Sequence, residues 1–321
     1  MYYRPQFPFL KFRKTAFLLS GVLILVGIIS LLLQGLNLGI DFTGGTVLHL
    51  DLREDYHMEE VRDVLSPFEL EGAPLQRAGH NDLGEGTEVI IKAPTLEGEV
   101  REEIINSFLQ RWPQMTTEDI LREENVGAVI GRELTREAFT ALLIAFTGMV
   151  LYITLRFESR FALAGIAALL HDAFIILTLF SLFRLEINSP FIAAILTIIG
   201  YSINDTIVVF DRIRENIGKY WHKKGREEIV NDSINENLVR SINTSLTTLA
   251  VLLSLFAAFN YFVGTIDLKV FAIALIIGVI SGTYSSIFIA SPLWLFLTAN
   301  KEKKGKKQSP EALFTDTEMQ E

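Results

Sequence analysis

The sequence predicts a polytopic α-helical membrane protein with six transmembrane helices and one extracytoplasmic α+β domain. Three observations support this class: 50% of the 321 residues are hydrophobic, the mean hydropathy is +0.33, and the charges are unevenly distributed. Residues 36–137 contain 22 acidic and 9 basic residues, a net charge of −13, which leaves 16 acidic and 20 basic residues, a net of +4, elsewhere. The middle segment is therefore expected to be a water-exposed domain between apolar segments.

The composition excludes several functional classes. The chain has no cysteine, so a disulfide framework, a thiolate nucleophile and a cysteine-ligated zinc are excluded. A net charge of −9 argues against a nucleic-acid partner, because such binding depends on neutralising phosphates. The five histidines are scattered, and the sequence has no glycine-rich nucleotide-binding loop. We therefore expect neither an enzyme nor a bound cofactor.

Six apolar segments are long enough to cross a bilayer, which requires about 20 helical residues. The third segment contains His171 and Asp172, and the fourth contains Asp205. The first has the basic start of a signal peptide, but its apolar run is longer and no Ala-x-Ala site follows, so an uncleaved anchor is favoured. The predicted spans are 15–35, 138–155, 161–183, 187–210, 240–262 and 268–298.

The basic residues predict the orientation. They are concentrated in the N-terminus 1–14, the turn 156–160, the loop 211–239 and the tail 299–321, which places these segments in the cytoplasm. Both termini are then cytoplasmic, and residues 36–137 form the domain on the outer side. The tail is expected to be disordered, with its first lysines near anionic lipid headgroups.

The outer domain is predicted to have a ferredoxin-like fold. Alternating apolar residues indicate strands, and apolar residues at helical spacing indicate two helices that end near prolines. Their order is the β-α-β-β-α-β of a split βαβ unit. His49, His57 and His80 are expected to be ordinary surface or strand residues. The predicted elements are strand 46–52, helix 58–68, strand 74–78, strand 87–93, helix 100–112 and strand 119–126.

Ionisable side chains within the spans are the candidate functional residues, because each costs about 2.5 kcal/mol or more to insert. Asp172, which follows His171, is predicted about 16 Å deep, and Asp205 about 9 Å from the inner interface. Arg240 precedes the hydroxyl-rich segment 241–248. These residues fit a proton relay of carboxylates, a guanidinium and hydroxyls.

A structural interpretation of the same residues remains open. Asp172 and Asp205 fit polar contacts between helices equally well, His171 fits a packing role, and for Arg240 an interfacial anchor is favoured. In the last span, the Gly278-x-x-x-Gly282 spacing predicts close helix packing.

Several motifs resemble the SecD/SecF family of export proteins, and its SecF branch in particular. They occur in order over nearly the whole chain, apart from the termini and parts of the outer domain. They are GIDFTGG at 39–45, His171-Asp172, GYSINDTIVVFDRIRE at 200–215, RSINTSLTT at 240–248 and GTYSSIFIA at 282–290.

This resemblance implies one half of a proton-driven machine related to RND transporters, located in the bacterial cytoplasmic (inner) membrane. The implied partners are SecD, the SecYEG channel with SecA, the translocating preprotein and membrane lipids, and, with less support, YidC and YajC. The implied energy source is the proton gradient. Asp205 and Arg240 match family residues of the proton path, and Asp172 with His171 matches a recurring pair.

The resemblance also implies a family signature turn, formed by Gly39, Asp41, Phe42, Gly44 and Gly45. Its glycines permit unusual backbone angles, and Asp41 is expected to be a capping or turn residue rather than a proton carrier.

The number of spans predicts that a second chain is needed. Transporter folds of this type usually combine two repeats, and the sequence contains one. Half of an RND-type small-molecule or lipid exporter, and a non-transporting scaffold subunit, remain alternatives. Sodium in place of the proton also stays open.

Overall fold

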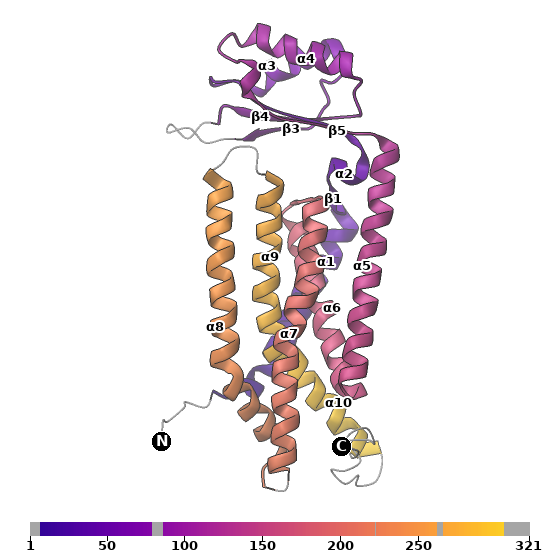
Figure 1. Ribbon diagram of the computed structural model, residues 1–321, viewed down its shortest axis with the longest axis vertical. Helices are drawn as coiled ribbons and strands as arrows, with labels where there is room; N and C mark the ends of the chain where they lie inside the picture. Colours follow the sequence, from indigo (N-terminus) through magenta and orange to yellow (C-terminus); the bar gives the residue numbers. More distant parts are fainter. Residues whose placement is uncertain (1–6, 79–85, 222, 262–265, 305–321) are drawn as a thin grey trace.

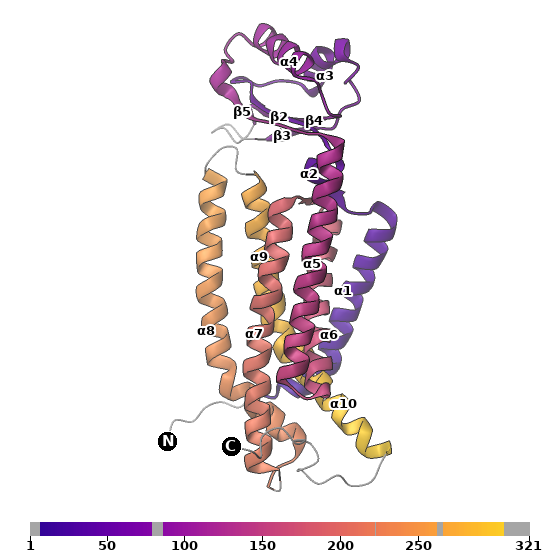
Figure 2. The same ribbon diagram turned by 45° about the vertical axis from the view of Figure 1, so that its right-hand side comes forward.

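A bundle of long helices carries an α+β domain at one end (Figures 1 and 2). The structure, a computed structural model, describes residues 7–78, 86–221, 223–261 and 266–304. Within this part of the chain, six helical segments are long and apolar enough to cross a membrane, which confirms the predicted polytopic class.

The first five of these segments are single helices, and the sixth is interrupted by a π-helical turn. A short 3-10 helix, Phe9–Phe12, precedes the first of them. They are α1 (Arg13–Gln34), α5 (Ala128–Arg156), α6 (Ser159–Leu182), α7 (Ser189–Tyr220), α8 (Arg226–Tyr261), and α9 (Ile266–Ser285), which continues through the π turn Ser286–Ala290 into α10 (Ser291–Lys304).

The helices extend beyond the spans predicted from uncharged runs. Helix α5 begins ten residues before the predicted span 138–155, within the segment assigned to the domain, and most of the predicted loop 211–239 belongs to α7 and α8. An uncharged run marks only the apolar part of a helix, whereas charged residues can continue it in water. Glu215, for example, pairs with Arg212 and Lys219 at helical spacing.

Some predictions concern residues outside the described ranges. These are the N-terminal residues 1–6, the end of the span 240–262, and His80 within residues 79–85. Most of the tail predicted to be disordered, from residue 305 onward, is also outside them.

The α+β domain has the predicted β-α-β-β-α-β order. Its four strands form one antiparallel sheet in the order β3-β4-β2-β5, which is a ferredoxin-like arrangement. Short 3-10 helices lie at Ser66–Phe68 and Thr117–Asp119. The main elements are β2 (Gly45–Asp51), α3 (Met58–Leu65), β3 (Leu75–Ala78), β4 (Glu88–Ala93), α4 (Gly98–Arg111) and β5 (Ile120–Val126).

The two faces of this sheet have different neighbours. Leu48 and Leu50, which alternate along β2, pack under α3 and α4 with Val61 and Phe108. The other face carries only a small apolar cluster around Val47 and points toward the bundle (Figure 1). This second face is therefore available for contacts with the ends of the long helices.

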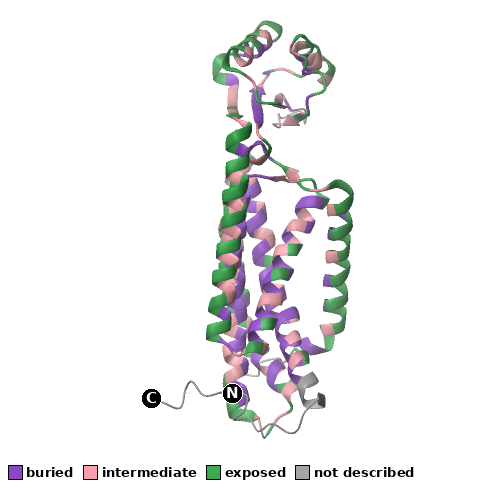
Figure 3. Cartoon of the chain, turned by 90° about the vertical axis from the view of Figure 1, so that its right-hand side faces the viewer, coloured by how far each residue is buried: buried purple, intermediate pink, exposed green. Residues whose placement is uncertain are grey.

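Helices α6, α7 and α9 form the centre of the bundle. In the most apolar stretch of each helix, 50% of the residues are buried in α6, 50% in α7 and 61% in α9 with its continuation. The corresponding shares are 6% in α5 and 11% in α8. Figure 3 shows the exposed residues along the outer helices. A Cβ at Gly278 would lie 1.9 Å from Ile198 Cδ1, and one at Gly282 would lie 3.0 Å from Ser202, which confirms the predicted close packing of α9 against α7.

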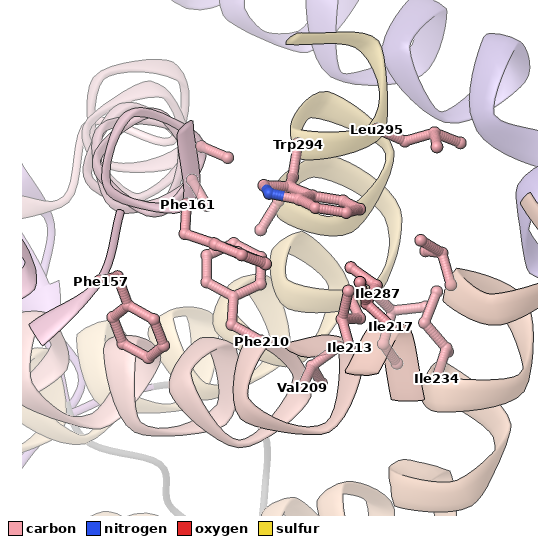
Figure 4. Close-up of a cluster of buried hydrophobic side chains, with 14 of the residues drawn as sticks. Phe157, Phe161, Val209, Phe210, Ile213, Ile217, Ile234, Ile287, Trp294 and Leu295 are labelled. Carbon is pink, nitrogen blue, oxygen red and sulfur yellow. The ribbon is translucent and has the colours of Figure 1, made fainter. Parts of the chain in front are cut away.

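An aromatic cluster fixes the end of the bundle that lies away from the α+β domain (Figure 4). The rings of Phe161 and Trp294 are stacked with their centroids 4.6 Å apart, and Phe210 lies 5.0 Å from Phe161. These contacts join α6, α7 and α10.

Candidate proton-relay site

Asp172 lies in the middle of α6 and is fully buried. Its carboxylate accepts hydrogen bonds from three serine hydroxyls, one on α7 and two on α9. Ser281 Oγ is 2.6 Å from Oδ1, Ser285 Oγ is 2.7 Å from Oδ2, and Ser202 also donates to Oδ2. Because a buried charge is costly without partners, these hydroxyls are what the carboxylate requires at this depth.

His171 extends the hydrogen-bonded network from Asp172 to α1. Its Nδ1 lies 3.0 Å from Asp172 Oδ1, and its Nε2 lies 3.0 Å from Ser20 Oγ. Ser20 Oγ is 3.1 Å from Tyr284 Oη, and that phenol donates to the carbonyl oxygen of Ala16 at 3.0 Å. A chain of exchangeable protons thus connects α1, α6 and α9.

Asp205 is on α7, where it is 5% exposed. Its Oδ2 is buried and has no hydrogen-bond partner among the described residues. Arg240 and Ser245 are both on α8, the helix that packs against α7 on this side. Because buried polar atoms without a partner are rare in folded proteins, this carboxylate is a candidate functional group.

Arg240 does not form a salt bridge with Asp205. It lies on an exposed face of α8, and the described part of the chain contains no ion pair within 4 Å between the two side chains. The structure therefore brings His171 and Asp172 into one network and leaves Arg240 at the edge of the bundle.

One turn of α7 connects the surroundings of the two carboxylates. Ser202, which donates to Asp172, precedes Asp205 by three residues. Thr206 Oγ1 lies 2.9 Å from Ser286 Oγ on the π turn, and Ser245 Oγ lies 2.6 Å from Thr283 Oγ1. Hydroxyl groups on α7, α9 and the π turn thus lie between the Asp172 carboxylate on α6 and Ser245 on α8.

The sequence-based reasoning missed the residues that surround Asp172. Ser202 and Ser285 lie within the motifs at 200–215 and 282–290, but nothing in those motifs indicates a contact with Asp172, because single serines within apolar helices are common. The four-residue spacing of Ser281 and Ser285, which places both on one helix face, was a further indication.

The helix that carries two of these serines is irregular at this point. Directly after Ser285 it widens into the π turn, where Ser291 Oγ donates to the carbonyl oxygen of Ser286 at 2.9 Å. Pro292 has no N–H, so the carbonyl four residues earlier lacks its usual helical partner. Such π turns are frequent at functional sites.

The signature turn joins the α+β domain to the bundle. Gly44 has φ = +72° and Gly45 φ = +139°, angles that disfavour other residues. A Cβ at Gly45 would lie 2.8 Å from the carbonyl oxygen of Ala93. Asp41 Oδ2 accepts a hydrogen bond from the backbone N–H of Ser189 at 2.7 Å, at the start of α7.

The remaining residues of the turn complete this joint. The N–H of Gly39 donates to the carbonyl oxygen of Ile187 at 2.8 Å, and Phe42 packs against the central cluster of the bundle.

These features define a multi-pass membrane protein that combines a ferredoxin-like domain with buried carboxylates in a helical bundle. A family model described as "Protein export membrane protein SecD/SecF, C-terminal" matches residues 110–300, and a second, "SecD/SecF GG Motif", matches residues 29–50. The chain belongs to the SecD/SecF family of protein-export membrane proteins.

Relatives from several bacteria are similar over nearly the whole chain. Protein translocase subunit SecF of Sebaldella termitidis is 38% identical over 303 residues, which is 93% of this chain and 96% of the relative. SecF of Pseudomonas aeruginosa is 35% identical over 293 residues, 91% of this chain and 92% of the relative.

A solved structure and a longer relative extend the comparison. The crystal structure of SecDF from Thermus thermophilus superposes with a TM-score of 0.81 at 36% identity over 93% of this chain. Protein translocase subunit SecDF of Bacillus subtilis is 37% identical over 95% of this chain. This chain spans 40% of the length of each of these two longer chains.

Proposed function

We propose that this chain is the SecF half of a SecDF assembly that uses the proton gradient to promote export of unfolded proteins across the cytoplasmic membrane. The proposal rests on Asp205, a buried carboxylate in a candidate membrane-spanning helix, one oxygen of which has no hydrogen-bond partner in the described part of the chain. Gain or loss of one proton there changes the charge inside the bundle, and the packing of neighbouring helices then responds. Asp172 and His171 form the second part of the relay.

The exposed face of α8 supports a second half as partner. Arg240, Asn243, Thr247 and Ser254 are all exposed and follow one another at spacings of three, four and seven residues, so they form a polar stripe that the exposed Val251 interrupts. Polar stripes at membrane depth are more stable against protein than against lipid. We assign this stripe to contact with SecD, since homologous chains contain both halves in one polypeptide.

The family membership supports the wider set of partners. Relatives that match nearly their whole length are protein translocase subunits. On this basis we propose action beside the SecYEG channel and SecA on a translocating preprotein, with YidC and YajC as further partners. We also propose that both termini lie in the cytoplasm and the α+β domain outside it, because the basic residues are concentrated in 1–14, 156–160, 211–239 and 299–321.

Replacing Asp205 with Asn tests the relay. We expect the Asp205→Asn complex with SecD to assemble and to lose the part of preprotein export into vesicles that depends on the proton gradient. Asp63→Asn, at an exposed position on α3, is the matched control and should export like the wild type. Full gradient-dependent export by Asp205→Asn would show that the relay is wrong and would favour a scaffold role.

A further inference from the structure

The open face of the sheet is attached to the bundle by two salt bridges. Lys92 on β4 pairs with Glu186 on β6 (Glu186–Ile187), and Arg122 on β5 pairs with Asp267 at the start of α9. The four side chains are only 17–28% exposed, whereas those of Arg13 and Glu227, which pair at the other end, are 36% and 65% exposed. Partial burial strengthens such pairs relative to surface ones.

Main-chain contacts reinforce the same joint. Strand β1 (Asn37–Leu38) pairs in parallel with β6, which immediately precedes α7. The Asp41 carboxylate accepts from the backbone N–H of Ser189, a donor at the helix N-terminus that has no partner within the helix. The signature turn thus holds the first residue of α7.

The beginnings of α7 and α9 are also bonded to each other. Asn188 Oδ1 accepts from the N–H of Phe191, and its Nδ2 donates to Asp267 Oδ1 at 2.6 Å. A small cavity of about 30 Å³ lies between the sheet and these helix ends, lined by Asp41, Lys92, Arg122, Glu186, Asn188 and Asp267 among others. Apart from the packing of Phe42, these contacts are polar bonds between parts, which can rearrange more readily than a packed apolar core.

The two helices tied to the domain are those that build the buried site. Helix α7 carries Asp205 and Ser202, and α9 carries Ser281 and Ser285. Ser189 precedes Asp205 by 16 residues, a separation of about 24 Å along the helix. A change in the spacing of α7 and α9 at the carboxylates would therefore alter the spacing of their outer ends.

We propose that this joint transmits changes at the buried carboxylates to the α+β domain. Asp41, Glu186 and Asp267 are its positioning residues, which act through α7 and α9 and carry no proton themselves. The inference rests on the proposed function, because it gives the relay its mechanical output. Coupling of this kind is reciprocal, so a change at either end must affect the other.

Reversing the charges of the Lys92–Glu186 pair, first singly and then together, tests the joint by its effect on export. In the complex with SecD, we expect Glu186→Lys to reduce gradient-dependent export by about fivefold or more, the lower end of typical coupling. Lys92→Glu combined with Glu186→Lys should restore most of it. Glu123→Lys, which breaks the Arg101–Glu123 pair inside the α+β domain, is the control and should have little effect. Equal losses in Glu186→Lys and Glu123→Lys, or no recovery in the double variant, would overturn the proposal.

Hydrogen exchange provides a readout that does not depend on export. In the same complex in membranes, Asp205→Asn should change the exchange rates of the Gly39 and Ser189 amides by about fivefold or more. If Asp205→Asn abolishes gradient-dependent export and leaves these amides unchanged, the joint is wrong while the relay stands. If it leaves export unchanged, the relay itself is wrong.

Discussion

Asp172 and Asp205 show two ways of placing a carboxylate inside a membrane bundle. Asp172 receives three serine hydroxyls and contacts His171, whereas Oδ2 of Asp205 has no hydrogen-bond partner among the described residues. The first environment stabilises one position of the surrounding helices. The environment of Asp205 favours a change in protonation or in helix position, because this carboxylate oxygen is left unsatisfied. In the proposed relay we therefore place the gain and loss of the proton at Asp205, and Asp172 with His171 forms its hydrogen-bonded second part.

The serines around Asp172 should contribute measurably to stability. Ser285→Ala removes one donor to a buried carboxylate, and a hydrogen bond to a charged group is worth about 1.5–3 kcal/mol. We expect a loss of that size in the free energy of unfolding, measured in detergent. Thr154→Ala on α5 is the control, because that exposed hydroxyl donates to its own helix, at Val150. Equal effects of the two substitutions would contradict this role.

In the α+β domain, we expect the contact between Asp119 and Arg53 to weaken at acid pH. The Arg53 guanidinium, followed by donors on Thr116, holds the pKa of this carboxyl below its usual value. Because the folded pKa is depressed, the contribution is complete above the unfolded pKa of about 3.9 and is lost as the pH falls through the folded value.

The variant Asp119→Asn provides the measurement. It should lower the thermal unfolding midpoint at pH 7, and its difference from the wild type should shrink as the pH falls below 4. A difference that stays constant over this range would contradict the assignment.

At the scale of elements, the contact between α7 and α9 organises the bundle. Gly278 and Gly282 let the two helices approach closely, and this approach brings Ser281 and Ser285 to Asp172. The π turn that follows rotates the next segment, so that Trp294 reaches the aromatic cluster with Phe161. Close packing and the buried polar site therefore depend on each other.

Adding one methyl group to this contact tests that dependence. Gly278→Ala would place its Cβ 1.9 Å from Ile198, and overpacking of this kind costs about 1–3 kcal/mol. The unfolding midpoint in detergent should fall accordingly. Gly148→Ala on α5 meets no atom within 4 Å and should leave stability unchanged or raised. A neutral Gly278→Ala would contradict the packing argument.

The elements differ in how far the sequence predicts them. The six apolar segments and the ferredoxin-like order follow from hydrophobic periodicity, which is a local property. The ends of α5, α7 and α8 did not follow, because these helices continue through charged residues. The pairing of β1 with β6 involves two residues on each side and leaves no periodic signal.

The candidate site was predictable only in part, because the sequence shows local patterns and not the contacts between distant helices. Charged residues in apolar spans stand out, so Asp172 and Asp205 could be found. Their serine partners come from distant helices and depend on tertiary packing. The exposure of Arg240 also depends on the arrangement of α8, which sequence spacing does not determine.

At the scale of the whole molecule, three groups of contacts follow one another along the bundle, from the end away from the α+β domain to the domain itself. The aromatic cluster around Trp294 fixes the end away from the α+β domain, the carboxylate layer lies within the bundle, and the charged joint holds the domain at the other end. In the proposed assembly, the polar stripe on α8 contacts the second half. This arrangement is suited to converting a proton's movement into movement of the α+β domain.

Proton entry during export tests this account most directly. The complex with SecD is reconstituted with the translocation channel in vesicles that contain a pH-sensitive dye, and a gradient is imposed. We predict that export by the wild type is accompanied by proton movement down the gradient, and that Asp205→Asn abolishes this movement while the complex remains assembled. Equal proton movement in the wild type and in Asp205→Asn would contradict the account.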